Sequence, residues 1–176
     1  MRYFTPELLT RIRSADEEIS AEAHQEWEQA IIRSRRRWQK IQAAFPKKVQ
    51  RFEEDQVCLH DAQVLSMGQH GRTFIIVLQT EPPTQQMVLL MFTLDQEPQI
   101  DTTALPGKPD SSYVTWMYEE FDLGRHKQCT FEVLLSNGWA VKLRFQDFHF
   151  LMGHQILPPK NDRAARVSPP PIPRSA

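Results

Sequence analysis

The sequence predicts an α+β protein, with N-terminal helices packed on a mostly antiparallel β-sheet of five to six strands. Two observations support this class. Apolar residues recur every three or four positions between residues 19 and 45, which is the period of an amphipathic helix. From about residue 56 the apolar residues fall instead in short runs separated by glycine and proline, as in strands joined by turns.

The size and composition of the chain predict one folded domain with a tail. The chain has 176 residues, of which 40% are hydrophobic and 24% charged, which is typical of a single globular domain. We expect the domain to cover residues 1–157, helical over 1–55 and mainly β over 56–157. Residues 158–176 are rich in proline and poor in apolar residues, so they predict a disordered tail.

Two helix starts follow one another near the N-terminus. Thr5 before Pro6 is typical of an N-cap followed by the first helical residue, and this helix should end near Arg13. Ser14, with Glu17 three residues later, matches a capping box and predicts a second start. No glycine or proline interrupts residues 15–45, so a helix of about 45 Å can follow, with a further short helix after it.

The β region divides into apolar runs. Runs 74–78 and 87–94 are apolar on both faces, which predicts central strands covered on both sides, with the helices as one cover. Turn residues between successive runs favour an antiparallel meander. The expected strands are residues 62–67, 74–78, 87–94, 113–122, 129–135 and 139–145.

One hairpin can be predicted in detail. A three-residue loop at 136–138 places apolar residues opposite each other on one face, and Glu132 opposite Lys142 on the other. Gly138 would then adopt the left-handed backbone conformation that such a loop requires. The apolar residues change parity later in the second strand, which predicts a bulge near residues 146–147.

The cysteines and the chain start indicate location. Cys58 and Cys129 lie in apolar segments without the spacing of a disulfide framework or a zinc site, so we expect both to be small core residues. The first residues lack the apolar run of a signal peptide, and no segment is long enough to span a membrane. These features predict a cytoplasmic protein.

The candidate catalytic residues are His60 and Asp61. A His-Asp pair is typical of one class of metal-dependent phosphohydrolase, in which a further His and Asp complete the site. The alternative is that the pair turns the backbone at the entrance to a strand. No glycine-rich phosphate loop or G-x-S-x-G motif is present, and we expect no cofactor.

A metal ion would need several such groups to converge. The candidate ligands are oxygen and nitrogen groups that a hard or borderline metal prefers: His60, Asp61, Glu119 or Glu120, Asp147 and His149. Because neighbouring strand residues point to opposite faces, only one of Glu119 and Glu120 can join a given cluster. The alternative is a solvated rim of the sheet.

The long helix has an acidic half and a basic half on its outward face. The residues opposite the apolar stripe are Glu18, Glu22, Glu26, Arg33, Arg36 and Lys40. This sign order complements the helix dipole on a solvated face, but it would also suit a protein partner. An antiparallel copy of the helix would set acidic half against basic half and favour a homodimer. Contact of the basic half with nucleic acid is the least favoured alternative.

Several short segments resemble a known group of proteins. Three of them are Met1-Arg2-Tyr3-Phe4-Thr5, Glu26-Trp27-Glu28 and Leu59-His60-Asp61-Ala62. They resemble uncharacterised bacterial proteins grouped as domains of unknown function. Two further segments look similar too: Asn137-Gly138-Trp139 and Arg144-Phe145-Gln146-Asp147-Phe148. The resemblance implies a bacterial source and a shared fold, and no activity. From the residues we expect a non-catalytic binding protein, adaptor- or immunity-like, with a metal-dependent hydrolase as the alternative.

Overall fold

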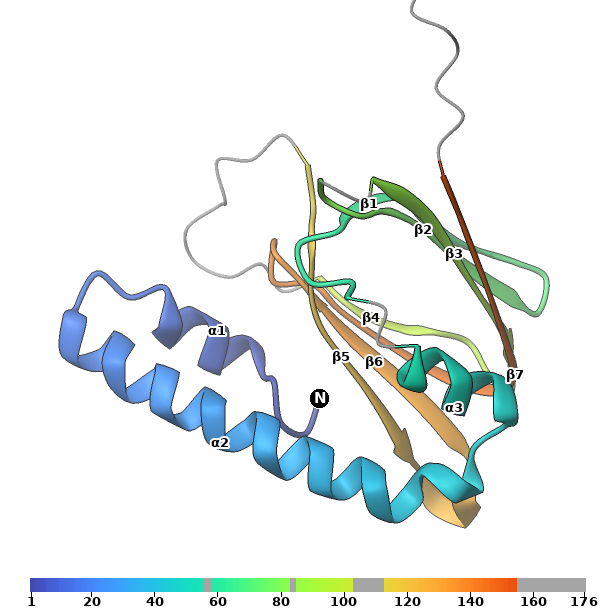
Figure 1. The fold of residues 1–176 in the computed structure, drawn as a ribbon, viewed down its shortest axis with the longest axis horizontal. Helices are drawn as coiled ribbons and strands as arrows, with labels where there is room; N and C mark the ends of the chain where they lie inside the picture. The colour runs from blue at the N-terminus through green and yellow to red at the C-terminus, as the bar shows by residue number, and fades with distance from the viewer. Residues whose placement is uncertain (56–57, 83–84, 103–112, 155–176) are drawn as a thin grey trace, which may run out of the picture.

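A computed structural model describes residues 1–55, 58–82, 85–102 and 113–154 of the chain. Over these residues, helices at the N-terminus precede and pack on one antiparallel sheet, which confirms the α+β prediction (Figure 1). The proposed Pro-rich tail, residues 158–176, lies outside the described residues. None of the described helices combines the length and apolar character needed to cross a membrane.

Side-chain caps determine where the first two helices begin. Helix α1 (Pro6–Ile12) starts after Thr5, whose hydroxyl accepts the N–H of Leu8 at 3.2 Å, which confirms the first predicted cap. Helix α2 (Glu17–Ile41) starts after Asp16 rather than Ser14. The Asp16 carboxylate accepts two N–H groups of the first turn, so a charged cap takes the place of the expected capping box.

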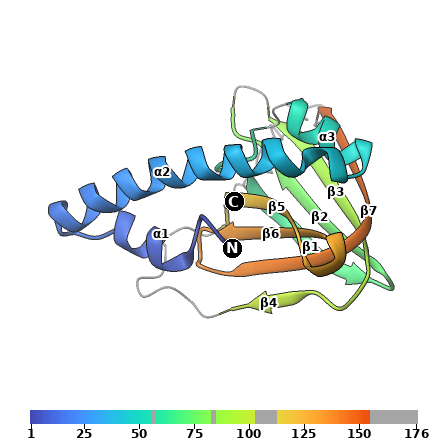
Figure 2. The same ribbon diagram turned by 90° about the horizontal axis from the view of Figure 1, so that it is seen from below.

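The helical region ends in two shorter elements. A 3-10 turn, η1 (Gln42–Ala44), follows α2 directly, and helix α3 (Lys47–Glu54) begins after Pro46. Figure 2 shows α2 passing above β5 and β6. Its N-terminal half, together with α1, projects past the ends of the strands.

The sheet has the order β1-β2-β3-β7-β6-β5, with the short β4 paired to β7. Its strands are β1 (Gln63–His70), β2 (Thr73–Gln79), β3 (Gln86–Leu94), β4 (Gln99–Asp101), β5 (Trp116–Leu123), β6 (Cys129–Leu135) and β7 (Ala140–His154). A single meander is therefore wrong: β1–β3 and β5–β7 form two meanders that join where β3 pairs with β7. The long strand β7 makes this possible, because its two halves pair with different neighbours.

The predicted hairpin and bulge are both confirmed. Glu132 lies opposite Lys142 in the β6–β7 ladder, and their side chains form an ion pair at 2.5 Å. Gly138 in the loop has φ 85°, in the left-handed region. The β3–β7 register shifts between Thr93 and Leu94, which leaves Gln146 as the extra residue of a bulge.

The core lies on the concave face of the sheet, under α2 and α3. Phe52 of α3 packs edge-on against Phe121, Phe148 and Phe150, which joins the helix to both halves of the sheet. The even-numbered side chains of β2 and β3 are buried in this core, except Gln86 at the start of β3. Their odd-numbered side chains are only partly buried, so the expected cover on both sides is wrong. Apolar contacts between adjacent strands shield that face in part.

The two edges of the sheet meet near the start of β1. Asp61 donates its backbone N–H to the Trp116 carbonyl at 2.8 Å, and Trp116 donates to Ala62 at 2.9 Å. These bonds place the His60–Asp61 turn beside β5. Cys58, in the same connection, is exposed, and Cys129 is partly buried; both thiols are free. The expectation that Cys58 is a core residue is therefore wrong.

Candidate functional site

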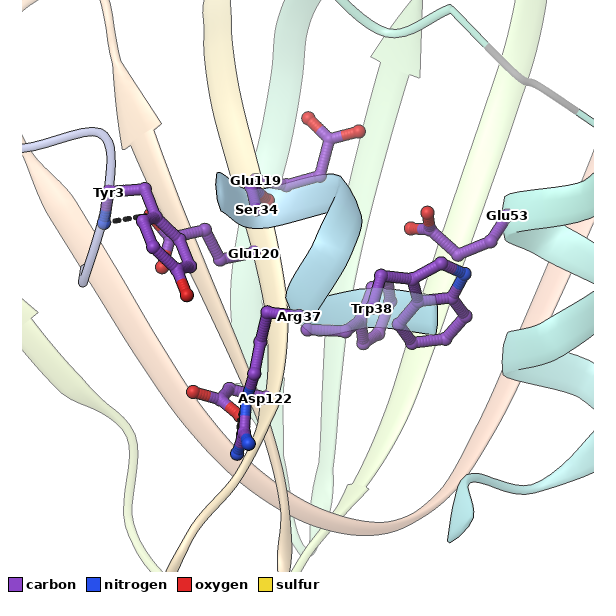
Figure 3. Close-up of a pocket in the computed structure, with 9 residues that line it drawn as sticks. Tyr3, Ser34, Arg37, Trp38, Glu53, Glu119, Glu120 and Asp122 are labelled. Atoms are coloured by element: carbon purple, nitrogen blue, oxygen red, sulfur yellow. Dashed lines mark hydrogen bonds and ion pairs between the residues drawn. The ribbon is translucent and has the colours of Figure 1, made fainter. Parts of the chain in front are cut away.

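A pocket opens between α2, α3 and β5, with an empty volume of about 370 Å³ that includes its open mouth. In Figure 3, Glu53 enters from α3 and Trp38 from α2, and the Arg37–Asp122 pair lies to one side. The lining residues are Tyr3, Ser34, Arg37, Trp38, Glu53, Glu119, Glu120, Phe121 and Asp122.

Two carboxyl groups of this pocket have raised pKa values. Burial, and to a lesser degree the charge of Glu119, raises the pKa of Glu53 to about 7. Burial also raises the pKa of Glu119, although the Trp116 indole N–H donates to its carboxylate at 2.6 Å and His60 lies near enough to oppose the shift. The pocket therefore contains a carboxyl group that exchanges its proton near neutral pH.

The other two acids of the pocket are used to fix the chain. Glu120 accepts the backbone N–H groups of Arg2, Tyr3 and Phe4 at 2.8–2.9 Å and so anchors the N-terminal segment to β5. Asp122 accepts two donors of the Arg37 guanidinium at 2.7 and 3.0 Å, which ties α2 to the same strand. Glu120, expected as a metal ligand, faces this segment.

The His60–Asp61 pair forms an exposed turn before β1. His60 Nδ1 lies 2.7 Å from the Asp61 carboxylate, and its Nε2 lies 3.4 Å from the Tyr118 hydroxyl. Asp61 has φ 64°, a left-handed conformation that aspartate tolerates. The Tyr118 ring stacks on Phe4, with ring centres 4.8 Å apart. The turn is thus packed against the N-terminal anchor.

The Asp147–His149 pair lies at a different place, on β7 next to α3. The Asp147 carboxylate is 2.9 Å from His149 Nε2. The Lys48 ammonium lies 3.4 Å from the Asp147 carboxylate and 2.6 Å from the His149 ring. A lysine between the two groups already supplies the positive charge that a metal ion would bring.

The proposed metal ligands are therefore divided among three places. His60 and Asp61 lie at the entrance to β1, Glu120 at the N-terminal segment, and Asp147 with His149 beside α3. Within the residues that the structure describes, no three His, Cys, Asp or Glu side chains gather closely enough to bind one metal ion. Among the described residues, these candidate ligands therefore do not converge on one site.

The charged face of α2 remains open. Glu18, Glu22, Arg33, Arg36 and Lys40 are exposed. In the described part of the chain none of these five makes a side-chain hydrogen bond or an ion pair. The sixth predicted residue, Glu26, is also exposed and pairs with Arg11 of α1 at 2.5 Å.

Sequence reasoning missed Glu53 as a site residue. It follows the buried Phe52 in α3, but nothing local indicates that it faces β5 across a pocket. The only indication in the sequence is a carboxylate next to a buried aromatic residue on a helix. This pattern is too common to identify Glu53 as a site residue.

No protein-family model matches the chain, and neither a curated protein nor a solved structure matches it. The site must therefore be interpreted from its own geometry.

Proposed function

We propose that this is a non-catalytic binding protein that docks a protein partner through the outward face of α2. The observation that supports it is the row of exposed charges on this face, acidic in the first half and basic in the second, of which all but Glu26 have no side-chain partner among the described residues. An adaptor- or immunity-like role fits such a surface.

The placement of the helix favours docking. Half of α2 projects past the sheet with only α1 beside it, so a partner can approach without meeting the strands (Figures 1 and 2). Separated blocks of opposite charge direct a partner into one orientation and suppress others.

The alternative functions have less support. Hydrolysis by His60 and Asp61 would need further metal ligands, and the described residues bring none to this pair. Nucleic-acid binding through Arg33, Arg36 and Lys40 would place phosphates next to the acidic half of the same helix, which repels them.

We also propose a cytoplasmic location in a bacterium. Two free thiols, one of them exposed at Cys58, favour a reducing compartment. The bacterial source depends on the sequence resemblance alone.

Site-specific photo-crosslinking in the native cells tests the binding function. A photoreactive residue at Gln25 or Gln29, both exposed on the outward face, should give covalent protein adducts. The same residue at Gln69, exposed on β1, is the matched control and should give none. Equal adduct formation at all three positions, or none at any, would refute docking by α2.

A further inference from the structure

We propose that the partner of α2 is a second copy of this chain, bound through the same face with the two helices antiparallel about Gln29. This inference rests on the function proposed above and identifies the partner of that surface. It follows from the positions of four of the charges, from the uncharged residue Gln29 between them and from the projection of the helix.

Four of the six outward charges are placed symmetrically about one residue. Glu18 and Lys40 both lie eleven positions from Gln29, and Glu22 and Arg36 both lie seven positions from it. In an antiparallel pair centred on Gln29, a residue on one side meets the residue at the same spacing on the other side. Glu18 then lies opposite Lys40 of the second copy and Glu22 opposite Arg36, and two-fold symmetry forms each pair twice.

The residue at the symmetry axis, Gln29, has no charge, whereas Glu26 and Arg33 lie three and four positions from it. A two-fold axis sets each central residue against itself or its close neighbours, so a charge there would repel its own copy. Gln25 and Gln29 occupy this region, together with Ile32, whose side chain is 41% exposed. An amide pair with an exposed isoleucine beside it suits the centre of such a contact.

These residues also form one continuous stripe. Successive steps of four and three residues join Glu18, Glu22, Gln25, Gln29 and Ile32, and Arg36 follows four residues later. This spacing keeps side chains on one side of a helix and suits two helices packed at a small angle. From Glu18 to Lys40 the stripe extends about 33 Å at 1.5 Å per residue.

A parallel arrangement would not work. It would place acid against acid and base against base along the whole stripe, whereas the antiparallel arrangement neutralises both halves. The antiparallel pair also separates the two sheets. In Figure 2 the sheet lies under the C-terminal half of α2, so in the antiparallel pair the two sheets would lie at opposite ends.

Charge exchange in the purified full-length chain tests this arrangement. Variant A, Glu18→Lys with Glu22→Lys, makes the whole stripe basic. Variant B, Arg36→Glu with Lys40→Glu, makes it acidic. The four-fold variant exchanges the two halves. Sedimentation equilibrium at low and high salt measures the dimer dissociation constant of each, and circular dichroism checks that each is folded.

We expect the wild-type chain to dimerise at low salt and to dissociate as salt is added. Variants A and B alone should dimerise at least about tenfold more weakly, because four surface attractions become repulsions. Their mixture should form A–B heterodimers, and the four-fold variant should recover the homodimer, since both restore opposite charges along the whole stripe.

A wild-type monomer at low salt and at the highest concentration reached would overturn the inference. So would dimers that variants A and B leave unchanged, or a four-fold variant that stays monomeric. A monomer that still gives α2 adducts with another protein in cells would remove the homodimer and leave the binding function in place. Adducts of twice the chain mass at Gln29 would support both.

Discussion

A carboxyl group in the pocket gives the fold a specific pH dependence. Burial next to Glu119 raises the pKa of Glu53 from 4.5 to about 7, so the folded chain binds this proton more tightly than the unfolded chain does. The stabilisation of the folded chain by this bound proton is therefore complete below pH 4.5, decreases as pH rises and is lost above pH 7. A difference of this size corresponds to about 3 kcal/mol.

The substitution Glu53→Gln removes this ionisation and keeps the size of the side chain. We expect the variant to be more stable than the wild type by about 3 kcal/mol at pH 8 and by only about 1 kcal/mol at pH 5. Unfolding by urea, followed by tryptophan fluorescence at the two pH values, measures both differences. The tryptophans suit this assay because Trp38 lines the same pocket.

Glu54→Gln is the matched control, because Glu54 is the exposed neighbour of Glu53 on the same helix. It should change stability by less than about 0.5 kcal/mol at either pH. A Glu53→Gln variant with equal gains at pH 5 and pH 8, or with none at pH 8, would show that burial of this carboxyl group does not oppose its ionisation.

Two further substitutions test the anchors of the fold. Glu120→Gln weakens the acceptor of three backbone N–H groups, so it should lower the free energy of unfolding by about 1–3 kcal/mol. At low denaturant, amide hydrogen exchange should become faster at Phe4 and stay unchanged in α3. Gly138→Ala forces alanine to φ 85° and should lower the stability measured by thermal unfolding by at least about 1 kcal/mol. The control Gly68→Ala should cost less, because Gly68 has no positive φ and a Cβ there would meet no atom within 4 Å. Equal costs for the two variants would contradict the turn geometry.

Local rules predicted much of this fold correctly. The Thr5 cap, the three-residue loop with Gly138 and the bulge at Gln146 all follow from the chemistry or spacing of a few neighbouring residues. The cap of α2 was misplaced by two residues because Ser14 and Asp16 are both good caps, and only the structure shows which accepts the N–H groups of the first turn.

Long-range features could not be predicted in the same way. Nothing in the sequence of β3 indicates that it pairs with β7 rather than with the next strand, because several strand orders bury the same apolar face. Whether Glu53 lies close to Glu119 depends on this strand order and on how α3 packs against the sheet. The separation of His60 from His149 has the same origin, since β1, which follows His60, and β7, which contains His149, are separated by β2 and β3 in the sheet.

Among the acids and bases of this protein, some support the fold and others lie on the outward face of α2. Asp122 and Glu120 each accept several donors, so their substitution must weaken the fold. Glu22 and Arg36 have no partner in the described chain, and their substitution removes no contact within the molecule. A loss of association in such variants therefore reports a contact with another molecule, and recovery on exchange of the charges identifies that molecule as a second copy.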